Sequence, residues 1–170
     1  MRLYIIRHAW AEEPGPRWSD DSARPLTIDG RKRFRKVVEA LAERGFAPQL
    51  VATSPYVRAR ETAELIVRHL GKQTPQLETL DALRCGSDLA AALQWTAPRG
   101  EEEIAWVGHM PDVAEIAASL IGDKRSGDRF QQRRGGGHRF RRTTDGRGRP
   151  VALVRYGEDS GRLRRTSRPK

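Results

Sequence analysis

The 170-residue sequence has a single cysteine, Cys85, and lacks any long apolar run. One cysteine can form neither an intrachain disulfide nor a multi-cysteine metal site. No stretch approaches the roughly 18 to 20 consecutive apolar residues of a membrane-spanning helix, and Arg7 comes too early for the apolar part of a signal peptide. We therefore expect a soluble, single-domain protein of the reducing cytoplasm, with no membrane association.

Positive charge is abundant but confined to one end of the chain. The formal net charge is +10; residues 1–123 contain 16 Lys and Arg against 18 Asp and Glu, a net of −2, whereas residues 124–170 contain 16 against 4, a net of +12. A strongly basic chain attracts phosphate backbones. Since the body of the chain is not basic, we expect nucleic-acid binding only as a non-specific property of residues 124–170.

Apolar periodicity predicts alternating strands and helices in the first 122 residues. The expected strands are 3–6, 50–53, 77–80 and 104–107, and the expected helices run from Thr27 to Gly45, Ser54 to Gly71, Asp88 to Trp95 and Pro111 to Ile121. Strands joined through helices of this length require crossover connections, which give a mostly parallel sheet covered on both faces. The sequence therefore predicts a three-layer α/β/α sandwich.

The pattern weakens beyond Gly122. Residues 133–149 (RRGGGHRFRRTTDGRGR) have almost no apolar content and no period, so we expect no core element there. A final strand would be expected near residues 132–142 but is missing from the pattern, and both an Arg/Gly-rich insertion and a shift of reading frame would explain this. Residues 151–154 can form one last strand. We divide the chain into a core, 1–122, and a basic segment, 123–170, that completes or is appended to the same domain.

Arginine and histidine residues follow three of the predicted strands. Arg7 and His8 end the first strand, Arg58 lies in the first turn of the helix after the second, and His109 follows the fourth. Because ligands bind beyond the carboxyl ends of parallel strands, we expect these side chains to meet there. Two guanidiniums and the helix N-termini can hold a tetrahedral dianion, and a histidine can attack its phosphorus while a second stabilises the oxygens. The sequence thus predicts a phosphate site that reacts through a phosphohistidine intermediate.

Four motifs make this prediction more specific. The segments LYIIRHA, RPLTIDG, LVATSPYVRARETAELI and VGHMPD, in this order, resemble the histidine phosphatase superfamily and, within it, the small SixA-like phosphohistidine phosphatases. The resemblance covers roughly residues 1 to 122 and implies a phosphoglycerate mutase-like fold without a metal or cofactor. It also implies that His8 is the nucleophile, that Arg7 and Arg58 bind the phosphate, that His109 completes the site and that Arg24 lies near it.

The proton donor is the uncertain part of the resemblance. Relatives carry a glutamate after the third strand, where this chain has LETLDALRCG, which offers Asp81 with Glu78 nearby. Asp21, in the loop before Arg24, is a second candidate and is also expected to contact the substrate. A weak or missing acid favours leaving groups that depart easily, such as those of phosphoramidates, over alkyl phosphates.

The short chain also bears on the substrate. Little sequence lies between Gly71 and Gly100 to form a lid, so we expect an open site that suits a phosphohistidine on a protein surface. We predict a phosphoramidate or phosphomonoester hydrolase that acts on protein phosphohistidine. The alternatives are a small-molecule phosphomonoesterase with the same site, and a weakly active protein whose basic tail binds nucleic acid. Cys85 lacks an arginine six residues later, so a cysteine-phosphatase loop is excluded and we expect it to be structural.

Overall fold

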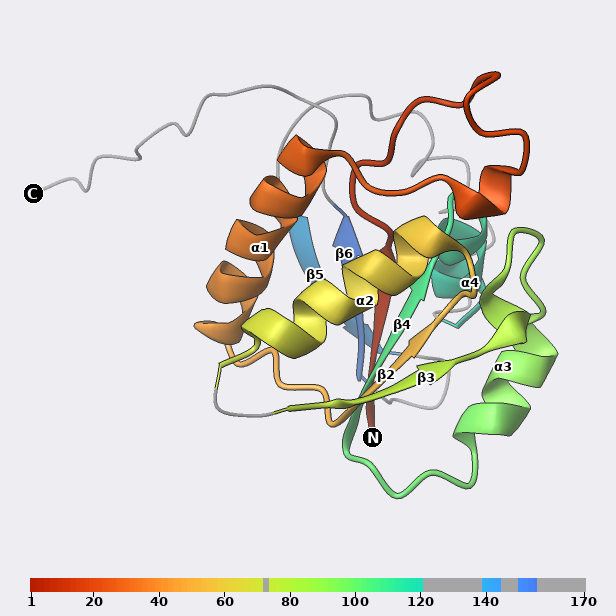
Figure 1. Cartoon of the computed structure of the whole chain (residues 1–170). Helices are drawn as coiled ribbons and strands as arrows, with labels where there is room; N and C mark the ends of the chain where they lie inside the picture. Colours follow the sequence, from red (N-terminus) through yellow and green to blue (C-terminus); the bar gives the residue numbers. More distant parts are fainter. Residues whose placement is uncertain (72–73, 121–138, 145–149, 156–170) are drawn as a thin grey trace, which may run out of the picture.

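A six-stranded sheet forms the centre of the molecule (Figure 1). The computed structural model describes residues 1–71, 74–120, 139–144 and 150–155. The strands are β1 (Arg2–Arg7), β2 (Leu50–Thr53), β3 (Gln76–Thr79), β4 (Glu103–Gly108), β5 (Arg139–Thr144) and β6 (Pro150–Arg155). Their order is β3-β2-β4-β1-β6-β5; β5 runs antiparallel to β6, and every other neighbouring pair is parallel. The predicted mostly parallel sheet is confirmed.

Helices cover both faces of this sheet. They are α1 (Ile28–Ala42), α2 (Val57–His69), α3 (Leu89–Thr96) and α4 (Asp112–Leu120), with short 3-10 helices η1 (Asp21–Ala23) and η2 (Asp81–Leu83). Successive side chains of a strand point to opposite faces. Tyr4 and Ile6 of β1 accordingly pack in the cluster that includes α1 and α2, whereas Leu3 and Ile5 pack with α3 and α4. The three-layer α/β/α arrangement is therefore confirmed.

The start of α1 holds the segment after β1 in place. Thr27 caps the helix by accepting a hydrogen bond from the Gly30 amide at 2.8 Å, and the Thr27 amide donates to the Trp10 carbonyl at 3.0 Å. A Cβ at Gly30 would lie 2.3 Å from that carbonyl oxygen, so only glycine permits this approach. The residues that follow His8 are thereby fixed against the helix.

The second helix begins later than the sequence predicts. Ser54 and Pro55 were expected to start it, but α2 begins at Val57 with Tyr56 as its N-cap. The Ser54 hydroxyl instead contacts His109 and accepts a hydrogen bond from the Tyr56 amide, and no side chain caps α2. Arg58 still falls in the first turn, as predicted.

Residues 133–149, in which we expect no core element, supply an edge strand of the central sheet. β5 forms at Arg139–Thr144 and pairs antiparallel with β6, whose position confirms the last strand expected at 151–154. An edge strand is stabilised by backbone hydrogen bonds to a single neighbour, so it can form without the apolar pattern on which the expectation relied. Residues 132–138 and 145–149 lie outside the described part of the chain.

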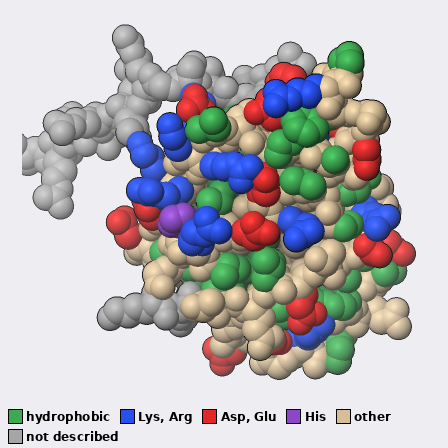
Figure 2. Space-filling view, viewed as in Figure 1, with side chains coloured by type: hydrophobic (Ala, Val, Ile, Leu, Met, Phe, Trp, Pro, Cys, Tyr) green, Lys and Arg blue, Asp and Glu red, His purple; other side chains and the backbone are tan. Residues whose placement is uncertain are grey.

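Charged side chains on the α1 and α2 face are mixed in sign. Figure 2 shows lysine and arginine interspersed with aspartate and glutamate over these helices. Arg31 pairs with Glu61 at 2.6 Å and Arg35 pairs with Glu39 at 3.0 Å. On this face, the described residues therefore form no patch of a single charge sign. Among the described residues, no helix is long and apolar enough to cross a membrane.

Candidate active site

Backbone hydrogen bonds hold the ends of three strands side by side. The His8 amide donates to the Gly108 carbonyl at 2.9 Å, which continues the pairing of β1 with β4. The Ser54 amide donates to the Val107 carbonyl, also at 2.9 Å, which continues the pairing of β2 with β4. Consequently His8, Ser54 and His109 meet at one edge of the sheet, and the two imidazole rings lie 5.3 Å apart.

His8 is held in a single tautomer. Its Nδ1 lies 2.7 Å from the Ala9 carbonyl oxygen, which can only accept, so Nδ1 carries the hydrogen and Nε2 has a free lone pair. The Ala9 amide in turn donates to the Thr62 hydroxyl at 2.9 Å. Burial lowers the pKa of His8 to about 3, and the positive charges of Arg7 and Arg58 act in the same direction. His8 is therefore neutral at neutral pH, as a nucleophile must be.

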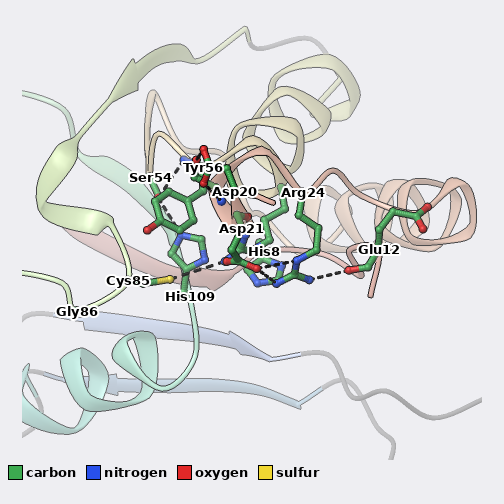
Figure 3. A network of polar contacts seen from close by, with 12 residues as sticks. His8, Glu12, Asp20, Asp21, Arg24, Ser54, Tyr56, Cys85, Gly86 and His109 are labelled. Atoms are coloured by element: carbon green, nitrogen blue, oxygen red, sulfur yellow. Dashed lines mark hydrogen bonds and ion pairs between the residues drawn. The ribbon is translucent and has the colours of Figure 1, made fainter. Parts of the chain in front are cut away.

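His109 is buried beside it, with 2% of its surface exposed. Its Nε2 lies 2.8 Å from the Ser54 hydroxyl oxygen, and its buried Nδ1 has no hydrogen-bond partner among the described residues. Burial is the main cause that lowers the pKa of His109 to about 4, followed by the charge of Arg58. Figure 3 shows His109 in one cluster with Ser54, His8 and Asp21.

Arg58 brings a buried positive charge into this cluster. Its Nη1 donates to the Asp21 carbonyl oxygen at 2.6 Å, and its Nη2 donates to the Asp21 carboxylate at 2.8 Å. The guanidinium also lies over the Tyr56 ring, 5.0 Å from its centre, and 3.8 Å from the Cys85 sulfur. Cys85, which we expect from the sequence to be structural, is thus a direct neighbour of Arg58, the arginine expected to bind phosphate.

Asp21 links the two arginines that the sequence assigns to the site. Its second carboxylate oxygen accepts from Arg24 Nε at 2.9 Å, while Arg24 Nη1 donates to the Glu12 carbonyl at 2.7 Å. Desolvation raises the pKa of Asp21, but hydrogen bonds and charge from Arg24 and Arg58 outweigh it and lower the pKa overall. Asp21 is therefore an ionised carboxylate bound by guanidinium donors that could also bind phosphate.

The other predicted acids have partners elsewhere. Asp81 follows β3 as expected, but its carboxylate is bound by Arg84 at 3.2 Å and its side chain is 76% exposed. Glu78 receives two hydrogen bonds from Arg99, at 2.9 and 2.8 Å. Of the three candidate acids, only Asp21 is recorded in contact with the arginines of the cluster. In the described part of the chain, no three His, Cys, Asp or Glu side chains gather in a way that could hold a metal ion.

Sequence reasoning missed three residues that support the cluster. Ser54 contacts His109, Thr62 holds the Ala9 peptide, and the Tyr56 ring lies 4.9 Å from the His109 ring at an interplanar angle of 57°. Ser54 offered a usable signal, because a hydroxyl directly after a buried strand must find a polar partner, whereas Thr62 lies in the middle of a helix and offered none. Tyr56 offered none beyond its place two residues after Ser54.

A family model supplies the decisive comparison. The model of the histidine phosphatase superfamily (branch 1) matches residues 3–134. The chain belongs to this superfamily. The predicted resemblance is confirmed, and the protein is a phosphatase by family.

This histidine phosphatase is similar to two curated proteins in sequence and to two solved structures in fold. An uncharacterized protein of Picosynechococcus sp. is 33% identical, covering 71% of this chain and 73% of its own length. The phosphohistidine phosphatase SixA of Escherichia coli is 27% identical, covering 71% and 74%. The structure of the protein histidine phosphatase SixA complexed with tungstate matches with a TM-score of 0.68 and 24% identity, over 88% of this chain and 92% of that chain. A phosphoglycerate mutase of Plasmodium falciparum matches with a TM-score of 0.57 and 14% identity, over 99% and 98%, so the fold is phosphoglycerate mutase-like, as predicted.

Proposed function

We propose that this histidine phosphatase hydrolyses phosphohistidine, carried on a protein, through a covalent phosphoryl intermediate on His8. The observation that carries the proposal is the hydrogen bond from His8 Nδ1 to the Ala9 carbonyl at 2.7 Å. It leaves the Nε2 lone pair of a neutral imidazole free beside a buried arginine. That arrangement suits nucleophilic attack on a bound phosphoryl group.

The reaction proceeds in two steps, phosphoryl transfer to His8 and hydrolysis of phospho-His8. His8 Nε2 forms a bond to phosphorus while the bond from phosphorus to the substrate's ring nitrogen breaks, and that nitrogen keeps the electron pair. When the substrate ring is protonated on its other nitrogen, it leaves as neutral imidazole without needing an acid. Water then attacks the phosphorus of phospho-His8, its proton goes to the released phosphate, and Nε2 regains its lone pair. Arg7, Arg58 and Arg24 offset the negative charge on the phosphoryl oxygens.

The choice of a phosphoramidate substrate rests on the acids of this chain. Asp81 and Glu78 are bound by surface arginines, and the Asp21 carboxylate is ionised. An ionised carboxylate cannot donate the proton that an alkyl alkoxide needs on departure, whereas an imidazole needs none. The name of the Escherichia coli relative, a phosphohistidine phosphatase, supports the same substrate class. The cytoplasm, expected from the sequence, is the compartment we propose.

The test is to trap the intermediate. Brief incubation with phosphoramidate, followed by intact-protein mass measurement, should reveal one added phosphoryl group that acid removes. His8→Ala should show none, while His69→Ala, at the far end of α2, should label like the wild type. A folded wild-type protein that never labels would contradict the proposal. Faster turnover of sugar phosphates than of a phosphohistidine protein would instead support the small-molecule phosphomonoesterase.

A further inference from the structure

The Ser54 hydroxyl lies between a donor and a ring nitrogen. The Tyr56 amide donates to Ser54 Oγ at 3.3 Å, and His109 Nε2 lies 2.8 Å from the same oxygen. Ser54 is fully buried, with 0% of its surface exposed. Its one hydroxyl hydrogen needs an acceptor, and among the described residues that acceptor is His109 Nε2. Ser54 therefore donates to Nε2.

The hydrogen bond from Ser54 to Nε2 determines which ring nitrogen of His109 is protonated. A neutral imidazole has one N–H, so a ring that accepts at Nε2 must be protonated at Nδ1. The Nδ1 atom is buried and has no hydrogen-bond partner among the described residues. A buried donor without a partner is costly, which points to a bound acceptor in the working state. Phosphoryl oxygens only accept, so they suit an N–H and are repelled by a bare lone pair.

We propose that Ser54 is a positioning residue that fixes neutral His109 in its Nδ1–H tautomer, so that the ring donates a hydrogen bond to the transferring phosphoryl group. This inference rests on the phosphoryl transfer proposed above. In this arrangement both histidines are protonated at Nδ1 and bare at Nε2, but they have complementary roles. Ala9 binds the N–H of His8 and leaves a bare nitrogen for attack, whereas Ser54 binds the bare nitrogen of His109 and leaves an N–H for the substrate.

Fixing the tautomer matters only while His109 is neutral. The titratable and charged groups that face it are Tyr56 and Arg58 at the start of α2, Asp21 and Arg24 from the η1 segment, and Arg7 and His8 at the end of β1. Burial and the three arginines disfavour the imidazolium, and Asp21 opposes them only in part, so the pKa is lowered to about 4. At neutral pH the ring thus has one hydrogen, whose position must be chosen.

Removal of the hydroxyl should leave a pH signature. Ser54→Ala takes away the bond that stabilises the neutral ring, so the pKa of His109 rises and both tautomers become populated. At lower pH the ring becomes an imidazolium, which carries hydrogen on both nitrogens and donates without help from Ser54. The defect of Ser54→Ala should therefore shrink as pH falls, while His8 stays neutral because its pKa is lowered to about 3.

The first experiment reads the tautomer directly in the unphosphorylated protein. Long-range ¹H–¹⁵N spectra distinguish protonated from bare ring nitrogens, and the four histidines of the chain can be assigned by single substitutions. We expect His109 to be protonated at Nδ1 and bare at Nε2, with the reverse form appearing in Ser54→Ala. A wild-type His109 protonated at Nε2 would overturn the proposal, and this readout does not depend on enzymatic activity.

The second experiment follows phosphoramidate hydrolysis across pH. Ser54→Ala should lower kcat by roughly 10- to 100-fold at neutral pH with a smaller change in KM, since the arginines remain. Ser54→Thr keeps a hydroxyl and should restore most of the lost kcat. Thr96→Ala should keep the wild-type kcat, because among the described residues the buried Thr96 hydroxyl bonds only the Ala92 carbonyl in α3. A defect that is constant with pH, or no defect, would overturn the proposal. Absence of any wild-type turnover would contradict the proposed function, while the tautomer spectra would still decide the role of Ser54.

Discussion

Asp21 occupies donors of the two arginines that we propose bind the phosphoryl group. Its carboxylate accepts from Arg58 Nη2 at 2.8 Å and from Arg24 Nε at 2.9 Å. Carboxylates and phosphoryl groups both engage a guanidinium through a pair of acceptor oxygens. A phosphoryl group that binds Arg58 at these atoms must displace Asp21, whose side chain is 53% exposed and has room to leave. If the arginines bind phosphate as we propose, Asp21 orients them at the expense of affinity for phosphate.

Asp21→Asn should therefore bind oxyanions more tightly. The amide keeps the shape of the side chain but removes the charge that holds the guanidiniums, so inhibition by inorganic phosphate should strengthen by about tenfold. The inhibition constant against phosphoramidate hydrolysis measures this. Glu13→Gln removes the same charge from an exposed position in the same loop and serves as the control. Weaker phosphate inhibition in Asp21→Asn would mean that orientation of the arginines outweighs competition.

The sequence predicted part of this constellation and not the rest. His8, Arg58 and His109 could be brought together because each follows a strand, and parallel strands deliver their carboxyl ends to one edge. The bond between Asp21 and Arg58 spans 37 positions and depends on where the loop after β1 folds back, which no local pattern encodes. The partnership of Ser54 with His109 was missed because a serine before a proline also fits the start of a helix.

Thr62 joins the end of β1 to the middle of α2. Its hydroxyl accepts from the Ala9 amide at 2.9 Å and donates to the Arg58 carbonyl at 2.6 Å, and it is fully buried. The same Ala9 residue supplies the carbonyl that fixes His8. Thr62 therefore holds the Ala9 peptide, whose carbonyl fixes His8, and ties it to the first turn of α2.

Replacing Thr62 by valine should cost stability and activity together. The substitution keeps the shape but leaves the buried Ala9 amide without an acceptor, which costs about 1–3 kcal/mol of unfolding free energy. Movement of the Ala9 peptide should also lower kcat. Thr96→Val is the matched control, because its hydroxyl only donates to a helix carbonyl at 2.8 Å and no donor is stranded. Urea unfolding and phosphoramidate turnover measure the two effects, and equal losses in both variants would count against a special role for Thr62.

Whole strands and helices were predictable where burial leaves a short apolar run or an apolar period. β2 forms at the predicted residues 50–53, and α1 ends before Gly45, whose φ of +84° lets the chain leave the helix. β5 could not be predicted in the same way. Its neighbour β6 supplies its backbone partners, and a single-sided hydrogen-bonded ladder leaves no periodic trace in the sequence.

The basic C-terminal segment takes part in the central sheet. β6 pairs in parallel with β1, with Leu3 opposite Val151 and Ile6 opposite Val154, so it covers the edge of the strand that carries His8. A chain ending at Arg155 keeps every described element and should unfold in one cooperative transition with nearly the full-length Tm. A chain ending at Gly122 exposes the edge of β1 and should melt lower or aggregate. Equal Tm values for the two truncations would show that the core needs no β6.

The two buried histidines make the stability of the whole molecule depend on pH. In the folded protein their pKa values are lowered, to about 3 for His8 and about 4 for His109, whereas an unfolded histidine titrates near 6.5. Between about pH 6.5 and 4 the unfolded chain therefore binds protons that the folded protein excludes. The free energy of unfolding should be at its full value above this range and should fall with acidification, by up to about 1.4 kcal/mol per pH unit for each histidine.

Removal of one histidine isolates its share of this dependence. Urea unfolding of wild type and His109→Gln between pH 7.5 and 4.5 should give a shallower slope for the variant, by at most about 1.4 kcal/mol per pH unit. The lowered pKa of Asp21 affects stability only at lower pH, below the range measured. Thr96→Val, which removes no titratable group, should leave the slope unchanged. Parallel curves for wild type and His109→Gln would mean that His109 is protonated as readily in the folded protein as in the unfolded chain, contrary to its buried, uncharged state beside Arg58.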